Sequence, residues 1–137
     1  MDVNRYLARM GYTGSIAPTA HTLAALHRAH MLTVPFENLD IPLGTPIVLD
    51  NDALFAKIVD HRRGGFCYEL NGLFAELLRS LGFQVALLSA GVYNATGQPG
   101  PDFDHMALLV ALEQRWLADV GFGDSFNTPL RLDDVVD

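Results

Sequence analysis

The segment RRGGFCYELNGLFAELLRSLG, residues 62–82, holds the clearest helix signal of the chain and its only cysteine. Apolar residues recur here every three or four positions, as on one face of a helix, and Gly82 stands where a glycine commonly ends one. Two glycines precede Cys67, which puts its thiol at the expected helix N-terminus, where negative charge is favoured. A thiol so placed can be held as the thiolate, the form that attacks acyl groups. The apolar positions are Leu70, Leu73, Phe74, Leu77, Leu78 and Leu81.

Three further helices are expected before this segment, so the first part of the chain should be helical. The last of them has Asp50 or Asn51 as its cap, because short polar side chains accept hydrogen bonds from free main-chain N–H groups. Residues 36–49 show no helical period and are expected to form an ordered loop. The expected helices cover residues 3–10, the stretch from Thr19 to just before Pro35, and residues 53–60.

After Gly82 the period changes to that of β-strands. Strands are expected over residues 83–93, 106–112 and 115–120, with a Gly/Pro-containing loop at 94–104. This order predicts an α+β fold with a helical unit at 1–82, which carries the thiol, and a partial β-barrel at 83–137. Three strands are too few to close a barrel, so an open sheet edge is expected.

Length and composition limit the classes of function. The chain of 137 residues is long enough for a real core, and its net charge of −7 argues against nucleic acid as a partner. One cysteine excludes an internal disulfide framework and a Cys-rich zinc site, and it fits a reducing compartment. The N-terminus lacks a signal-peptide pattern, and no apolar run approaches the ~20 residues of a membrane span. We therefore expect a cytoplasmic protein without a metal, nucleic-acid or membrane partner.

A cysteine nucleophile needs a base, and four of the five histidines are weak candidates. His21, His27 and His30 fall on one expected helix at mixed spacing. His27 and His30 could form a metal pair, but no third ligand motif lies nearby, which favours solvated or partly packed histidines. His61 follows a helix end, where a cation suits the helix dipole.

His105 and Asp119 are stronger candidates. His105 opens an apolar strand, a common position for an active-site side chain, although a solvated histidine at a strand start is the alternative. Asp119 is a lone carboxylate in a β-rich apolar segment. It is either buried with partners or it occupies a solvent-facing position of a half-exposed strand.

Strand register tests whether these two side chains can meet. If Glu113 and Gln114 formed a tight two-residue turn, Leu108 would lie opposite Asp119. His105 would then be on the other face of the sheet, because side chains alternate. A Cys-His-Asp arrangement therefore requires a longer turn, a bulge, or a His105 outside the regular ladder, and we predict one of these.

Four motifs taken together are similar to those of the arylamine N-acetyltransferase family. They are VPFENLD at 34–40, RRGGFC at 62–67, His105, and DVGFG at 119–123. The resemblance implies a cysteine-protease-like core in which Cys67 is the nucleophile, His105 its base and Asp119 the orienting carboxylate. It further implies ping-pong transfer of an acetyl group from acetyl-CoA to an arylamine, hydrazine or N-hydroxyarylamine.

Other residues match the family's pattern as well. Glu37 and Arg63 resemble a structural ion pair that holds the loop against the thiol-bearing helix, with two independent surface charges as the alternative. The resemblance assigns Phe36, Val92 and Phe122 to the acceptor pocket, although Phe36 and Phe122 read from sequence alone as ordinary core residues.

The chain departs from the family in length. Similar enzymes are longer and have a completed barrel and a C-terminal α/β lid that contributes much of the CoA site, so a truncated enzyme is expected. An amide synthase of the same fold, acting on a carrier-bound acyl chain, remains an alternative. So do a Cys-His-Asp hydrolase or transglutaminase-like enzyme, and an inactive fragment that self-associates through its open sheet edge.

Overall fold

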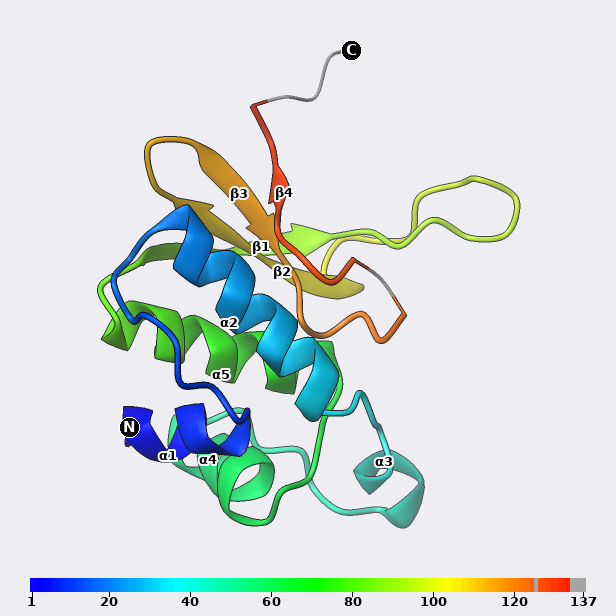
Figure 1. Ribbon diagram of the computed structural model, residues 1–137. Coiled ribbons are helices and arrows are strands. Elements are labelled where there is room, and N and C mark those ends of the chain that lie inside the picture. The colour runs from blue at the N-terminus through cyan, green and yellow to red at the C-terminus, as the bar shows by residue number, and fades with distance from the viewer. Residues whose placement is uncertain (125, 134–137) are drawn as a thin grey trace.

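A computed structural model describes residues 1–124 and 126–133 (Figure 1). Residues 134–137 of the expected second unit lie outside this described part. In chain order the helices are α1 Val3–Arg9, α2 Ala20–Thr33, α3 Asp40–Leu43, α4 Asn51–Phe55, the π-helical η1 Ala56–Asp60, and α5 Cys67–Ser80. The strands are β1 Gln84–Ala90, β2 His105–Ala111, β3 Arg115–Ala118 and β4 Leu130–Arg131.

Side-chain caps start three of the helices. Asp2, Thr19 and Asp50 each accept a hydrogen bond from the main-chain N–H three residues further on, which satisfies one otherwise free donor. The helix expected over 53–60 forms as α4 and then continues into η1, the π-helical turn. The loop expected over 36–49 is partly wrong, because it contains α3.

The sheet is antiparallel, with the strand order β1-β2-β3-β4. The count of three strands is corrected to four, because the short β4 pairs with β3. Two residues are too few to show a period-2 pattern in a sequence, so β4 could not be read there. Within the described residues, β1 and β4 are the two edges of the sheet.

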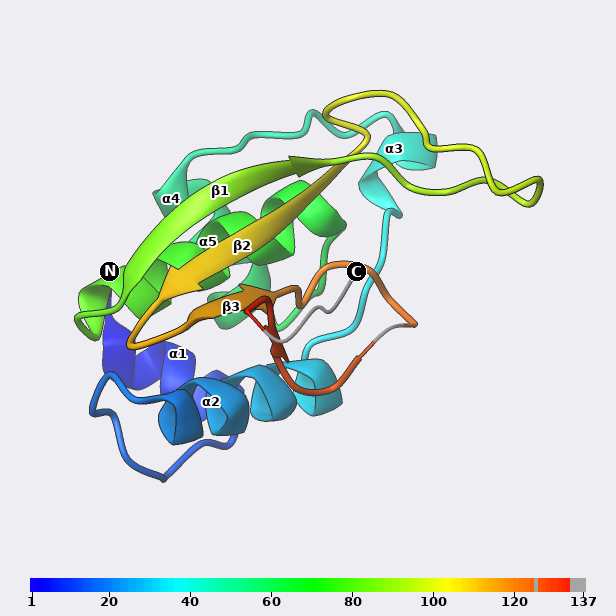
Figure 2. The same cartoon turned by 90° about the horizontal axis from the view of Figure 1, so that it is seen from above.

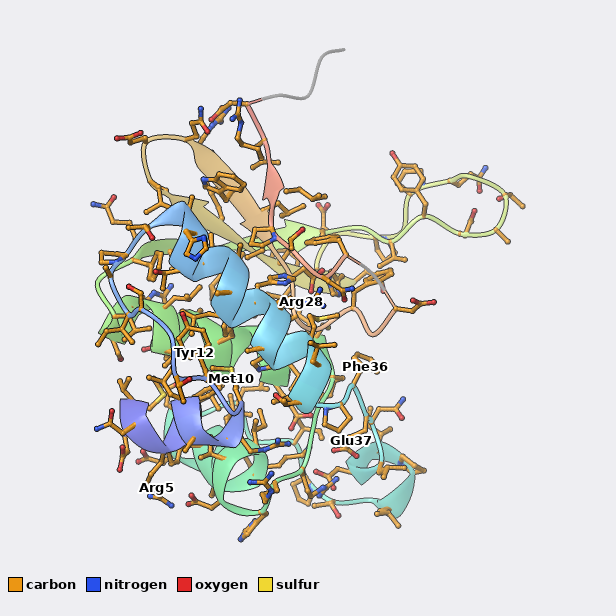
Figure 3. All side chains as sticks on the ribbon, viewed as in Figure 1. Arg5, Met10, Tyr12, Arg28, Phe36 and Glu37 are labelled. Carbon is orange, nitrogen blue, oxygen red and sulfur yellow. The ribbon has the colours of Figure 1, made fainter. Side chains whose placement is uncertain are left out.

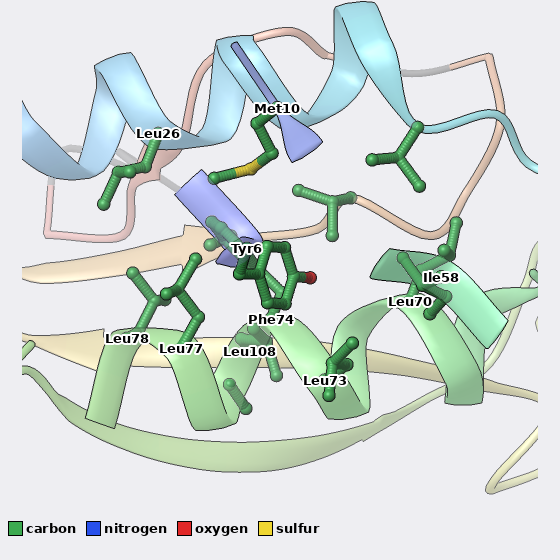
Figure 4. Close-up of a cluster of buried hydrophobic side chains, with 14 of the residues drawn as sticks. Tyr6, Met10, Leu26, Ile58, Leu70, Leu73, Phe74, Leu77, Leu78 and Leu108 are labelled. Atoms are coloured by element: carbon green, nitrogen blue, oxygen red, sulfur yellow. The ribbon is translucent and has the colours of Figure 1, made fainter. Parts of the chain in front are cut away.

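Helices cover one face of this sheet. In the view from above, α5 runs beneath β1 and β2, while α2 lies beside the β3 end (Figure 2). Side chains from α1, α2, η1, α5 and β2 meet in one core, and Phe74 of α5 is fully buried in it (Figure 4). Among the described residues, no helix is long and apolar enough to cross a bilayer.

The register of β2 and β3 shows which of the three predicted alternatives occurs: the turn is longer than two residues. Ala111 pairs with Arg115, so the turn has three residues, and Leu108 lies opposite Ala118. Leu108 and Ala118 are both fully buried in the helix-covered core. Because side chains alternate, His105 and Asp119 both fall on the other face of the sheet. One additional turn residue therefore brings the imidazole and the carboxylate to the same side.

Gly72 allows a test of helix propensity in α5. A Cβ atom there would meet its nearest neighbour, a methyl carbon of Leu54, at 3.8 Å, which is ordinary contact. Glycine in a helix interior costs about 1 kcal/mol relative to alanine. We expect Gly72→Ala to raise the free energy of unfolding by about 0.5–1 kcal/mol in urea titration, with an unchanged m-value. A destabilised variant would contradict the inference that a Cβ atom fits at position 72.

Candidate active site

The thiol is fixed by the segment that precedes it. Gly64 and Gly65 run beside the start of the 36–49 segment, where Gly65 forms a parallel bridge with Phe36. A Cβ atom on Gly64 would lie 1.7 Å from the carbonyl oxygen of Pro35, so only glycine fits there. Cys67 then becomes the first residue of α5, with 9% of its surface exposed.

The imidazole and the carboxylate form a short hydrogen bond. Nε2 of His105 lies 2.6 Å from Oδ2 of Asp119. The His105 and Cys67 side chains also interact, since each shifts the pKa of the other. The three side chains come from the start of β2, the residue after β3 and the start of α5, and all three are largely buried.

These contacts shift the protonation of all three groups. The interaction with Asp119, and to a smaller extent that with Cys67, raises the pKa of His105 to about 9. Burial would raise the pKa of the Cys67 thiol, but the hydrogen bonds from His105 and from the Met106 N–H lower it overall. Burial likewise acts to raise the pKa of Asp119, and His105 and Asn71 outweigh it. The arrangement favours a thiolate beside an imidazolium, the reactive form of a cysteine nucleophile.

Asn71 connects the elements of this site, and the sequence analysis did not identify it. Its Nδ2 donates to the carbonyl oxygen of Met106 at 2.7 Å and to Oδ1 of Asp119 at 2.8 Å. Its Oδ1 accepts from the N–H of Val120 at 2.9 Å. The sequence does contain an indication of this role: Asn71 follows Cys67 by one helical turn, so both residues share a face of α5.

The Glu37–Arg63 ion pair forms, and it belongs to a larger network. Nη2 of Arg63 lies 3.0 and 3.1 Å from the two carboxylate oxygens of Glu37, which follows α2 on the way to α3 (Figure 3). Asp40 bridges Arg63 at 2.7 Å and Lys57 at 2.8 Å. Lys57 also binds Glu69 at 2.7 Å. Oε1 of Glu69 accepts the N–H of Phe66 at 3.2 Å, so the network reaches the cap of α5. The roles of Asp40 and Lys57 were not predicted from the sequence.

A cavity of about 440 Å³ opens beside His105 on the sheet face that the helices leave uncovered. The rings of Phe122 and His105 lie nearly perpendicular, with centroids 5.2 Å apart. Phe36 does not line this cavity; it packs against Gly123. Phe36 and Phe122 are 45% and 43% exposed, so neither is an ordinary core residue. The lining includes Leu88, Val92, Tyr93, His105, Asp119, Phe122 and Phe126.

Two of the remaining histidines differ from expectation. His21 and His61 are exposed, but His27 and His30 are fully buried, so a solvated or partly packed environment is wrong for them. His30 contacts the hydroxyl of Tyr6, and its burial lowers its pKa to about 3. Residues 1–124 and 126–133 contain no group of three or more His, Cys, Asp or Glu side chains arranged to hold a metal ion.

Comparison with known proteins adds independent information. The model of the N-acetyltransferase family matches residues 19–137. The chain belongs to the arylamine N-acetyltransferase family. It is 46% identical to the Escherichia coli arylamine N-acetyltransferase over 132 residues, which cover 95% of this chain and 47% of the relative. The Mycobacterium marinum arylamine N-acetyltransferase structure superposes with a TM-score of 0.89 at 40% identity, covering 96% of this chain and 51% of that one.

Two further matches bear on function. A second Mycobacterium marinum structure, solved in complex with CoA, matches with a TM-score of 0.88 at 39% identity and the same coverage of both chains. Proansamycin X synthase from Amycolatopsis mediterranei is 35% identical over 140 residues, which cover 98% of this chain and 54% of the synthase. The chain spans about half the length of the curated relatives it matches.

The paired thiol and imidazole should be visible in the pH dependence of alkylation. Since the pKa of Cys67 is lowered, its reaction with iodoacetamide should rise with pH through a midpoint below the usual thiol value of about 8.5. Asp119→Asn removes the largest cause of the raised His105 pKa, so the midpoint should move up by about one pH unit. Asp60→Asn, which removes a carboxylate near the surface, is the control. A wild-type midpoint at the free-thiol value would contradict the inferred pair.

Gly121 lies very close to the thiol-bearing helix. A Cβ atom there would lie 2.7 Å from Cα of Cys67 and 2.9 Å from Nδ2 of Asn71. We expect Gly121→Ala to push the chain after β3 away from α5, at a cost of about 1–3 kcal/mol in unfolding free energy. Alkylation of Cys67 at neutral pH should slow as well. Gly72→Ala, which adds the same methyl group to α5 where there is room, should leave alkylation unchanged.

Proposed function

We propose that this chain carries the acyl-transfer centre of an arylamine N-acetyltransferase that moves an acetyl group from acetyl-CoA to an aromatic amine by way of Cys67. The observation that carries the proposal is the Cys67 thiol at the start of α5 beside an imidazole whose Nε2 lies 2.6 Å from Asp119. Family membership supports the same reaction class.

In the first half-reaction the Cys67 thiolate attacks the thioester carbonyl of acetyl-CoA. A new C–S bond forms, the bond to CoA breaks, and the His105 imidazolium gives its proton to the departing CoA thiolate. Asp119 stabilises the imidazolium and fixes its orientation. The main-chain N–H of Cys67, at the start of α5, is a candidate donor to the oxyanion that forms on the way.

In the second half-reaction the acceptor nitrogen attacks the acetyl-Cys67 carbonyl. His105, now neutral, accepts a proton from the amine, and Cys67 leaves as the thiolate. The cavity beside His105 suits a flat aromatic acceptor, because Phe122, Val92 and Tyr93 give it apolar walls. Arylamines, hydrazines and N-hydroxyarylamines are the proposed acceptors.

Acetylation of Cys67 tests the first half-reaction directly. Incubation with acetyl-CoA, without an amine, should add one acetyl group to the chain by intact mass and release free CoA. Cys67→Ala should take up none, and His105→Gln should slow uptake by at least about a hundredfold, as expected for loss of a general base. Addition of an arylamine such as aniline should remove the acetyl group. Acetylation that persists in Cys67→Ala would reject the assigned nucleophile.

The proansamycin X synthase relative favours one alternative function. An amide synthase of the same fold would load Cys67 from a carrier-bound acyl chain and close an amide bond through the same thiol and imidazole. A Cys67 that is acylated by a carrier-linked chain but not by acetyl-CoA would support this alternative. The synthase is less similar to this chain than the Escherichia coli enzyme, so we favour acetyl transfer.

The CoA site itself is expected to involve more than the described residues. The family's completed barrel and C-terminal lid are proposed to contribute to it. Titration of the chain with CoA separates binding from chemistry: weak binding together with slow acetylation of Cys67 would indicate a competent thiol and an incomplete cosubstrate site. The exposed edge of β1 is proposed as a route to self-association, which sedimentation velocity measures.

A further inference from the structure

His27 of α2 is a fully buried histidine with both ring nitrogens hydrogen-bonded. Its Nε2 lies 3.2 Å from the main-chain nitrogen of Asp119, and its Nδ1 lies 2.9 Å from the carbonyl oxygen of Asn127. A main-chain N–H can only donate and a carbonyl oxygen can only accept. The ring must therefore be neutral, with its proton on Nδ1. Burial lowers the pKa of His27, which agrees with a neutral ring.

The same ring contacts the wall of the cavity. It stacks on Phe126, with centroids 5.7 Å apart and planes inclined by 13°. Phe126 lines the cavity together with His105 and Phe122. His27 thus joins the main chain of Asp119 on one side to the cavity wall on the other.

This position matters because Asp119 lies just beyond the last residue of β3. The β2–β3 ladder ends at Ala118, so its strand pairing does not hold the main chain of Asp119. Asn71 holds the carboxylate through Oδ1, but the N–H of Asp119 is held by a residue 92 positions earlier in the chain. A shift of the Asp119 main chain would carry the carboxylate away from His105.

We propose that His27 is a positioning residue of the site: through Nε2 it sets the place of Asp119, and through its ring face and its bond to Asn127 it sets the place of Phe126 in the cavity wall. The expected effect of His27 on catalysis rests on the acetyl transfer proposed above. The expected effect of His27 on the Cys67–His105 pair is independent of that proposal, because alkylation of Cys67 measures the pair without any acetyl donor.

Two substitutions separate the two sides of the ring. His27→Gln can keep an acceptor near the position of Nε2, and His27→Asn can keep a donor near the position of Nδ1. Both bury one amide and lose the ring, so their general effect on the fold is matched. His30→Gln is the control, because His30 is buried in the same helix but contacts Tyr6 and Phe74 instead of the site.

The first measurement is the rate of Cys67 alkylation at neutral pH in folded protein, checked by thermal melting. His27→Gln and His30→Gln should stay within about twofold of wild type, and His27→Asn should be slower by about tenfold, as expected for a misplaced supporting group. In acetyl transfer, His27→Asn should lower kcat, whereas His27→Gln should mainly raise KM for the arylamine. Equal losses in all three variants would show a merely structural role and overturn the proposal.

The second measurement needs no variant and decides the case if the substituted proteins do not fold. Long-range ¹H–¹⁵N spectra of the wild-type chain report the tautomer of each histidine. His27 should be neutral at pH 7, with its proton on Nδ1 and an unprotonated Nε2. A proton on Nε2 would overturn the proposed contact with Asp119. A wild-type Cys67 no more reactive than a free thiol, with the expected His27 tautomer, would instead reject the proposed function and leave the contact standing.

Discussion

The site depends on one close contact, between the first turn of α5 and the chain that leaves β3. Gly121 lies so near the main chain of Cys67 that a side chain there would have no space. Asn71 joins the two segments by bonds to Asp119 and Val120, and a third bond ties both to β2 at Met106. The thiol, the imidazole and the carboxylate come from these three segments. They can therefore meet only when this contact forms.

Burial and hydrogen bonding act in opposite directions in this site. Burial alone would favour a neutral thiol, a neutral imidazole and a neutral carboxylic acid. The polar contacts reverse all three, because each charged form is matched by a partner within the same cluster. The site also lies at the border between the helix-covered face of the sheet and its open face. Its groups are thus largely removed from water, yet the imidazole still borders the open cavity.

The sequence predicted what local patterns determine. The period of α5, a cap at Asp50 or Asn51, and an irregularity that brings His105 and Asp119 to one face all depend on neighbouring residues or on strand alternation. It did not predict α3, where Asp40 finds its partners Lys57 and Arg63 only through tertiary contact. His27 illustrates the same limit. Its residue type favoured a solvated or partly packed position, and its partner Asp119 lies far away in the chain.

The Cys67 thiol and the cavity wall after β3 are held in place to different degrees. The thiol is fixed by the glycine contact with Pro35, by the Glu69 cap and by the ion-pair network of Glu37, Asp40, Lys57 and Arg63, which together leave the start of α5 little freedom. The cavity wall after β3 depends on side-chain contacts such as the stacking of His27 on Phe126. This difference suits the proposed ping-pong reaction. The nucleophile must keep one geometry for donor and acceptor alike, whereas the wall receives two molecules of different shape in turn.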